Sequence, residues 1–140
     1  MSIVPLGISH VRLTVTDIER SRAFYDAVFG LPVFAEVPAD ADEATREKLA
    51  FLFGGVLYHV GNNLLGLRPV APGTDRFDEN RVGLDHISLS VADKAAIDDA
   101  AAALDAQGIA HEPVKDIGEA WILEFRDPDN IALELFAVKG

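Results

Sequence analysis

One twelve-residue segment of the chain occurs twice, and this repeat constrains the fold more than any other feature. Residues 6–17 read LGISHVRLTVTD and residues 82–93 read VGLDHISLSVAD, with identical residues at five of the twelve positions. An internal repeat indicates one supersecondary unit built twice. Because His10 and His86 occupy the same place in the two copies, the repeat suggests a site to which both copies contribute.

Each copy alternates polar and apolar side chains, as a half-buried strand does. In residues 8–15, the polar side chains His10, Arg12 and Thr14 share one face, and the apolar side chains between them share the other. Residues 84–91 repeat the pattern. We therefore predict two equivalent strands, each with its apolar face against a helix and its histidine on the opposite face.

Signals for a helix follow both copies. Asp17 and Asp93 are placed to cap a helix N-terminus, and Gly30 and Gly108 are placed to end that helix in a left-handed conformation. Three extended segments follow each helix, so each half reads strand, helix, three strands. This order predicts an α+β fold of two tandem βαβββ modules, which form a curved, cup-like mixed β-sheet with the helices on the outside.

The chain is about the size of one structural domain. We expect the first module at residues 1–70, a linker rich in proline, glycine and charge at residues 71–81, and the second module at residues 82–140. The acidic stretch at residues 38–48 is expected to be a solvated loop or short helix.

Composition excludes several classes of partner. The formal net charge of −11 repels phosphate backbones, so we expect no nucleic-acid partner. This negative charge either keeps the protein in solution or indicates a groove that binds a cationic ligand. No apolar run is long enough for a transmembrane helix, and the N-terminus does not resemble a signal peptide, so no membrane contact is expected. The absence of cysteine excludes thiolate ligands and fits a cytoplasmic protein.

The strongest chemical pattern joins the two repeated histidines to a carboxylate in the last strand. Alternation in residues 131–136 places Glu134 on the face away from the helix. If His10, His86 and Glu134 converge in the cup, they form a set of two imidazoles and one carboxylate, which leaves open positions on a divalent ion. One Fe, Mn, Ni, Co or Zn ion fits these donors, although a single histidine in a strand is more often a packed or surface residue.

Five further residues are candidates around this site or alternatives to it. Arg12 and Arg68 share the cup face and are placed to anchor a carboxylate or phosphate, with a structural salt bridge as the alternative. His59 is a candidate for lining the cup. Trp121 fits equally a pocket wall or the core. His111 has no counterpart in the repeat and is expected to be structural or exposed.

The repeated segments SHVRLTVTD and GLDHISLSVAD, together with the ending FRDPDNIALELF, resemble the vicinal oxygen chelate superfamily. This group includes glyoxalase I, extradiol dioxygenases, fosfomycin-resistance enzymes, methylmalonyl-CoA epimerase and bleomycin-resistance proteins. The resemblance implies metal ligands at His10, His86 and Glu134, with Glu134 also the candidate catalytic base. It also implies a small substrate that chelates the metal through adjacent oxygens, and a homodimer.

Two departures from the family pattern bear on the reaction. Gly66 stands where glyoxalase I and the epimerase usually have a fourth ligand, and the strand AWILEFR lacks the tyrosine usual in the dioxygenases. The three-ligand set favours ring-cleaving dioxygenase chemistry over glyoxalase-like isomerase or lyase chemistry. The alternatives are a metal-free, bleomycin-resistance-like protein that sequesters a cationic or aromatic compound, and a degenerate module without chemistry.

Overall fold

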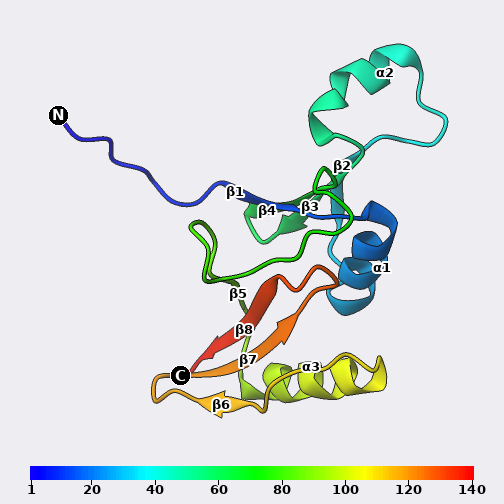
Figure 1. The fold of residues 1–140 in the computed structure, drawn as a ribbon. Coiled ribbons are helices and arrows are strands. Elements are labelled where there is room, and N and C mark those ends of the chain that lie inside the picture. The colour runs from blue at the N-terminus through cyan, green and yellow to red at the C-terminus, as the bar shows by residue number, and fades with distance from the viewer. The chain divides into compact units, whose positions relative to one another are not determined.

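The computed structural model describes residues 1–140 and divides them into two compact units, Met1–Asp75 and Arg76–Gly140. The division falls inside the segment expected as a linker, residues 71–81. Each unit contains a four-stranded mixed sheet and follows the order strand, helix, three strands (Figure 1). The predicted α+β fold of two tandem βαβββ modules is confirmed.

The first unit adds two short helical segments to the βαβββ plan. Its sheet has the order β1-β4-β3-β2, in which β1 and β4 are parallel and the other neighbours antiparallel. The acidic stretch at residues 38–48 contains a short helix, as expected. The elements are β1 (His10–Thr14), α1 (Ile18–Val28), β2 (Val33–Glu36), α2 (Glu43–Lys48), the 3-10 turn η1 (Ala50–Leu52), β3 (Val56–Val60) and β4 (Asn63–Arg68).

One face of the first sheet forms the core with α1. Leu13 and Val15 are buried at and just after the end of β1, as the alternation predicts. Tyr25 of α1 and Tyr58 of β3 are completely buried, and the Tyr58 hydroxyl donates a hydrogen bond of 2.9 Å to Asp26. These two rings add large apolar side chains to the core of this small unit.

The second unit has the same plan without the added helices. Its sheet has the order β5-β8-β7-β6, again with the first pair parallel, and α3 packs on β7 and β8 (Figure 1). None of the helices in the chain has the length and apolarity to cross a membrane. The elements are β5 (Ile87–Ser90), α3 (Lys94–Ala106), β6 (Lys115–Asp116), β7 (Ala120–Arg126) and β8 (Ala132–Val138).

The helix boundaries follow the predicted capping residues. The Asp17 carboxylate accepts from the amide of Arg20 at 3.1 Å, and the Asp93 carboxylate accepts from the amide of Ala96 at 2.9 Å. Gly30 and Gly108 follow the two helices with φ angles of 58° and 69°, a region that favours glycine. In both units, therefore, the helix that follows the repeated strand begins and ends at equivalent capping residues.

The turn between β7 and β8 is built around a buried carboxylate. Asp127 is 5% exposed, and its Oδ1 accepts hydrogen bonds of 2.8 Å from the amides of Asp129 and Ile131. Asn130 has a φ of 70°, which asparagine tolerates better than most residues. The sequence Asp-Pro-Asp-Asn thus closes a tight turn with its own side chains.

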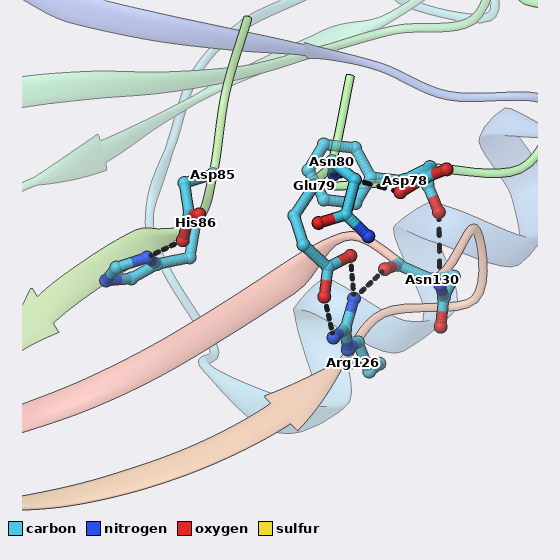
Figure 2. A network of polar contacts seen from close by, with 8 residues as sticks. Asp78, Glu79, Asn80, Asp85, His86, Arg126 and Asn130 are labelled. Carbon is cyan, nitrogen blue, oxygen red and sulfur yellow. Dashed lines mark hydrogen bonds and ion pairs between the residues drawn. The ribbon is translucent and has the colours of Figure 1, made fainter. Parts of the chain in front are cut away.

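This turn also anchors residues 76–86, the irregular segment that leads into β5 and that we call the strap. The Phe77 amide donates to the carbonyl of Asp129 at 2.9 Å, and the Asn130 side chain donates to the carbonyl of Phe77 at 3.0 Å. Arg126 contacts both carboxylate oxygens of Glu79, at 2.6 and 2.9 Å (Figure 2). This guanidinium lowers the pKa of Glu79 to about 2, so the pair remains charged at neutral pH.

Candidate metal and substrate site

Four of the predicted site residues share one face of the first sheet. The parallel pairing of β1 and β4 places Arg12 beside Gly66. Because side chains alternate along a strand, His10 lies on the face of Arg12, and Arg68 lies on the face of Gly66. The pairing of β3 with β4 brings His59 to that face as well. The face opposite the helix therefore collects the polar side chains, as the alternation predicts.

Gly66, which the resemblance aligns with the position of a fourth ligand, is covered by neighbouring side chains. A Cβ atom at this position would lie 2.6 Å from Leu57 Cδ2 and 2.9 Å from Arg12 Cγ. Arg12 continues past Gly66 and donates from Nη2 to the carbonyl of Phe51 at 2.9 Å, while its Nε is buried without a hydrogen-bond partner. The space that a longer side chain would need at residue 66 is therefore filled by Arg12 and Leu57.

The other predicted residues of the first unit lie at its surface or against exposed aromatic rings. His10, the first residue of β1, is exposed. The guanidinium of Arg68 lies 4.2 Å above the ring of Phe53, and the ring of His59 meets Phe34 edge-on at 5.1 Å. Stacking on Phe53 positions the Arg68 charge without neutralising it.

The corresponding face of the second sheet contains two carboxylates. Glu134 of β8 lies directly opposite Glu124 of β7, and on its other side Glu134 is the register partner of Ser88 in β5. The Ser88 hydroxyl donates to Glu134 Oε1 at 2.7 Å. The Lys115 ammonium contacts Glu124 at 2.6 Å. Serine and lysine thus supply the donors that two neighbouring like charges require.

His86 immediately precedes β5, so the strand is shorter than the expected residues 84–91. Its Nδ1 lies 2.6 Å from the carboxylate of Asp85 (Figure 2). Its Nε2 lies 3.9 Å from Glu134 Oε1. The hydrogen bond to Asp85 raises the pKa of His86, and the charge of Glu134 contributes in the same direction. In the neutral ring, a proton on Nδ1 leaves the free electron pair on Nε2.

A cavity of about 290 Å³ opens beside this pair, within the second unit. Five carboxylates line it against one arginine and two histidines, so its charge is mainly negative. Its charged lining includes Asp85, His86, His111, Glu124, Arg126 and Glu134. The lining thus combines donors suited to a hard cation with space for a small molecule.

Trp121 lies away from this cavity. It is adjacent to Ala137 in the β7–β8 pairing and occupies the face of β7 opposite to Glu124. Its ring contacts two ammonium groups, Lys94 of α3 at 5.2 Å and Lys139 at 4.3 Å. The structure therefore places Trp121 on the helix side of the second sheet and does not bring it together with Glu134.

Of the three predicted metal ligands, the structure brings together His86 and Glu134. His10 belongs to the other unit. No group of three or more histidine, cysteine or acidic side chains is arranged to hold a metal ion. The set of His10, His86 and Glu134 thus stays a prediction, with one pair of its members in place.

Four residues of these two faces were not singled out from the sequence. Asp85 contacts His86, and at the equivalent repeat position the Ser9 hydroxyl lies 3.1 Å from Nδ1 of His10. Ser88 and Glu124 flank Glu134 on its two neighbouring strands. The sequence does contain a signal for the first two, because a polar residue precedes the histidine in both copies of the repeat.

The chain is thus an α+β protein built from two βαβββ modules, each with a histidine on its polar face. The chain matches the sequence model of the Glyoxalase/Bleomycin resistance protein/Dioxygenase superfamily over residues 7–135. It belongs to this superfamily, whose name covers enzymes and resistance proteins alike.

Solved structures support the assignment. A glyoxylase/bleomycin resistance protein/dioxygenase domain from a Frankia species is 32% identical, with 97% of this chain and 94% of that chain covered and a TM-score of 0.73. Lactoylglutathione lyase from Agrobacterium tumefaciens is 24% identical (95% and 94% covered, TM-score 0.69). The fosfomycin resistance protein FosX from Listeria monocytogenes, in a mutant form complexed with Mn(II) and a dihydroxypropylphosphonic acid, is 18% identical (97% and 95% covered, TM-score 0.71). No curated protein matches significantly.

Proposed function

We propose that the protein is a divalent-metal-dependent enzyme that acts on a small substrate with two adjacent oxygen atoms. Its ligands would be His10, His86 and Glu134, and the ion would be Fe, Mn, Ni, Co or Zn. Membership of the superfamily supports this class of function, and the Mn(II) complex of FosX shows that a protein of this fold binds such an ion.

The observation that carries the proposal is the pair of His86 and Glu134. Their facing atoms, Nε2 and Oε1, are 3.9 Å apart, which is short enough for one ion with bonds of about 2.0–2.2 Å to contact both. The other ring nitrogen of His86 contacts a carboxylate, the usual partner of a histidine that ligates a metal. The donors present therefore fit a divalent cation.

An ion bound there would supply Lewis-acid stabilisation for negative charge that develops on a substrate oxygen. Glu134 would act as a ligand and as the base that accepts a proton from the substrate. In the first unit, Arg12 and Arg68 would orient an anionic group of the substrate, and His59 would line the site beside them. Arg68 is the better placed of the two arginines, because Arg12 is committed to the carbonyl of Phe51, whereas Arg68 lies over the ring of Phe53.

Among the reactions of the superfamily, we propose ring-cleaving dioxygenase chemistry ahead of isomerase or lyase chemistry. Gly66 has no side chain that could act as a fourth ligand, and Arg12 and Leu57 fill the space beside it. A three-ligand set leaves more coordination positions for exogenous molecules than a four-ligand set.

Metal content tests this proposal directly. The protein is purified without a tag or chelator, and its metals are quantified by inductively coupled plasma mass spectrometry beside those of Glu134→Ala. We expect about one transition metal ion per chain in the natural sequence and a large loss in the variant. Absence of metal after reconstitution with each candidate ion would overturn the proposal.

The charge of the cavity favours a second candidate function, the binding of a cationic compound without metal. Five carboxylates line the cavity, and Arg126 is the one arginine or lysine among its lining residues. Calorimetric titration with metal-free bleomycin in the presence of EDTA separates the two candidates. Tight binding under chelation supports sequestration, and binding that requires added metal supports the enzyme.

We further propose that the protein is a homodimer. Several large apolar side chains before β1 are exposed, among them Ile3, Val4, Leu6 and Ile8. A cluster of exposed apolar residues in one segment is typical of an interaction surface. Sedimentation equilibrium is expected to give twice the chain mass of 15.1 kDa, and a monomer at micromolar concentration would contradict the expectation.

A further inference from the structure

Two residues beside the His86–Glu134 pair contact these side chains from behind. Asp85 contacts the ring nitrogen of His86 that faces away from Glu134, and Ser88 contacts the carboxylate of Glu134. We propose that Asp85 and Ser88 are positioning residues, which fix the tautomer of His86 and the orientation of Glu134 before a metal ion binds. This inference rests on the proposed metal site and adds the residues that prepare it.

The contact of Asp85 decides which nitrogen of His86 is available. A carboxylate only accepts hydrogen bonds at neutral pH, so at a separation of 2.6 Å Nδ1 has to be the protonated nitrogen. The lone pair then lies on Nε2, the nitrogen that faces Glu134. Without Asp85, a neutral histidine would divide between two tautomers, and the form with the proton on Nε2 cannot bind a metal through that atom.

An exposed carboxylate orients a neighbour weakly unless its backbone is fixed, and the Asp85 side chain is 77% exposed. The strap supplies the fixed backbone. Its earlier part is joined to the β7–β8 turn by two hydrogen bonds of Phe77 and by the double contact of Glu79 with Arg126 (Figure 2). Its later part runs directly into β5. Asp85 and His86 therefore lie between two anchored points.

Ser88 acts on the carboxylate from the neighbouring strand. It is adjacent to Glu134 in the parallel pairing of β5 with β8, and its hydroxyl donates to Oε1 at 2.7 Å. The like charge of Glu124 lies on the other side of Glu134 and repels it. A donor on the β5 side thus draws the Glu134 carboxylate toward His86 and away from Glu124.

The repeat offers a matched comparison for Asp85. Ser9 occupies the equivalent position before His10, but a hydroxyl is uncharged and can either donate or accept. It therefore does not impose one tautomer on the ring. The two histidines are equivalent in sequence, but only His86 has a neighbour that fixes its protonated nitrogen.

Metal affinity is the first test. Binding of Zn²⁺ is measured by competition with a chromophoric chelator for the natural sequence, Asp85→Ala and Ser88→Ala. We expect each substitution to weaken binding by about 10–100-fold, the usual effect of removing a residue that orients a ligand. Ser88→Thr retains the hydroxyl donor and is expected to recover most of the loss, whereas Asp85→Asn can either accept from or donate to the ring and is expected to recover little. Asp99→Ala, an exposed site in α3, controls for net charge.

The tautomer of His86 in the metal-free protein is the second test, and it does not depend on metal binding. Nitrogen-15 chemical shifts at pH ~9, where imidazole is neutral, are expected to show the proton mainly on Nδ1 in the natural sequence and a mixture in Asp85→Ala. Unchanged shifts and unchanged Zn²⁺ affinity in Asp85→Ala and Ser88→Ala would overturn the inference. A natural sequence that binds no metal would instead overturn the proposed function, while the tautomer would still decide the role of Asp85.

Discussion

At the scale of single residues, Arg12 and Gly66 depend on each other. Arg12 crosses the sheet beside a position without a side chain, and Leu57 packs on the same spot from β3. The glycine is required by this close approach, since its φ lies outside the left-handed region. Its role is therefore steric: it provides the space in which Arg12 lies.

Gly66→Ala tests this dependence. The new methyl group would overlap Leu57 and Arg12, and overpacking of this kind costs about 1–3 kcal/mol of unfolding free energy. Urea denaturation followed by fluorescence measures the change. Gly73→Ala is the matched control, because a Cβ at that position meets no atom within 4 Å, and a change within about 0.5 kcal/mol is expected. Equal stability of the two variants would show that the space beside Gly66 is not filled.

At the scale of elements, His111 joins the end of α3 to the segment that follows it. Its Nε2 lies 2.9 Å from the carboxylate of Asp105, and its Nδ1 lies 2.7 Å from the carbonyl of Glu112. Both partners are acceptors, so both contacts are hydrogen bonds only when the ring is protonated. His111 therefore has a structural role: in its protonated form it links Asp105 to the carbonyl of Glu112, on one wall of the cavity.

Stability should depend on pH through this link. The hydrogen bond to the Glu112 carbonyl, together with Asp105, raises the pKa of His111 in the folded state. The stabilisation is therefore fully present below the ordinary imidazole pKa of about 6.5 and is lost as the pH rises through the raised value. We expect the difference in unfolding free energy between the natural sequence and His111→Gln to shrink over that range. A difference that is constant from pH ~5 to pH ~9 would contradict the link.

The turn between β7 and β8 makes a second prediction about an element. Asp127→Ala removes the buried acceptor of two hydrogen bonds, from the amides of Asp129 and Ile131, which should cost about 2–3 kcal/mol of unfolding free energy. Asp127→Asn retains an acceptor oxygen and is expected to lose less. The same denaturation experiment compares the two variants, and an equal loss would point to charge instead of hydrogen bonding.

Local patterns in the sequence were sufficient to predict the elements. Repetition, alternation and the capping aspartates gave the two βαβββ modules, and alternation placed Glu134, Arg12 and Arg68 on the correct faces. The contacts that surround the site were not predictable in this way. The pairing of Glu124 with Glu134 depends on strand register, and the contact of Glu79 with Arg126 joins residues far apart in the chain. Register in a hairpin depends on the exact geometry of its turn, and long-range docking depends on tertiary packing, so neither follows from alternation alone.

At the scale of the whole molecule, the net charge of −11 is the dominant property. The five carboxylates that line the cavity are a local concentration of this charge, although Glu79 and Glu124 are paired with Arg126 and Lys115. Repulsion among like charges destabilises a compact state, although it also keeps molecules apart in solution.

Added salt should therefore stabilise the protein. We expect the midpoint of thermal unfolding to rise between ~10 mM and ~150 mM NaCl, because the Debye length falls from about 30 Å to about 8 Å over that interval. Potassium glutamate at equal ionic strength should give the same rise, which separates screening from ion binding. A fall in the midpoint would mean that ion pairs such as that of Glu79 with Arg126 outweigh the repulsion.

The filled space beside Gly66 also bears on how such a protein can change. A glutamate introduced there alone would meet Arg12 and Leu57 before it could reach any ion, so the substitution would be selected against on stability first. Arg12 would first have to be replaced by a smaller residue, and that replacement alone would bring no benefit. In this chain, substitutions at residues 12 and 66 are therefore epistatic: a smaller side chain at residue 12 has to come before a larger one at residue 66.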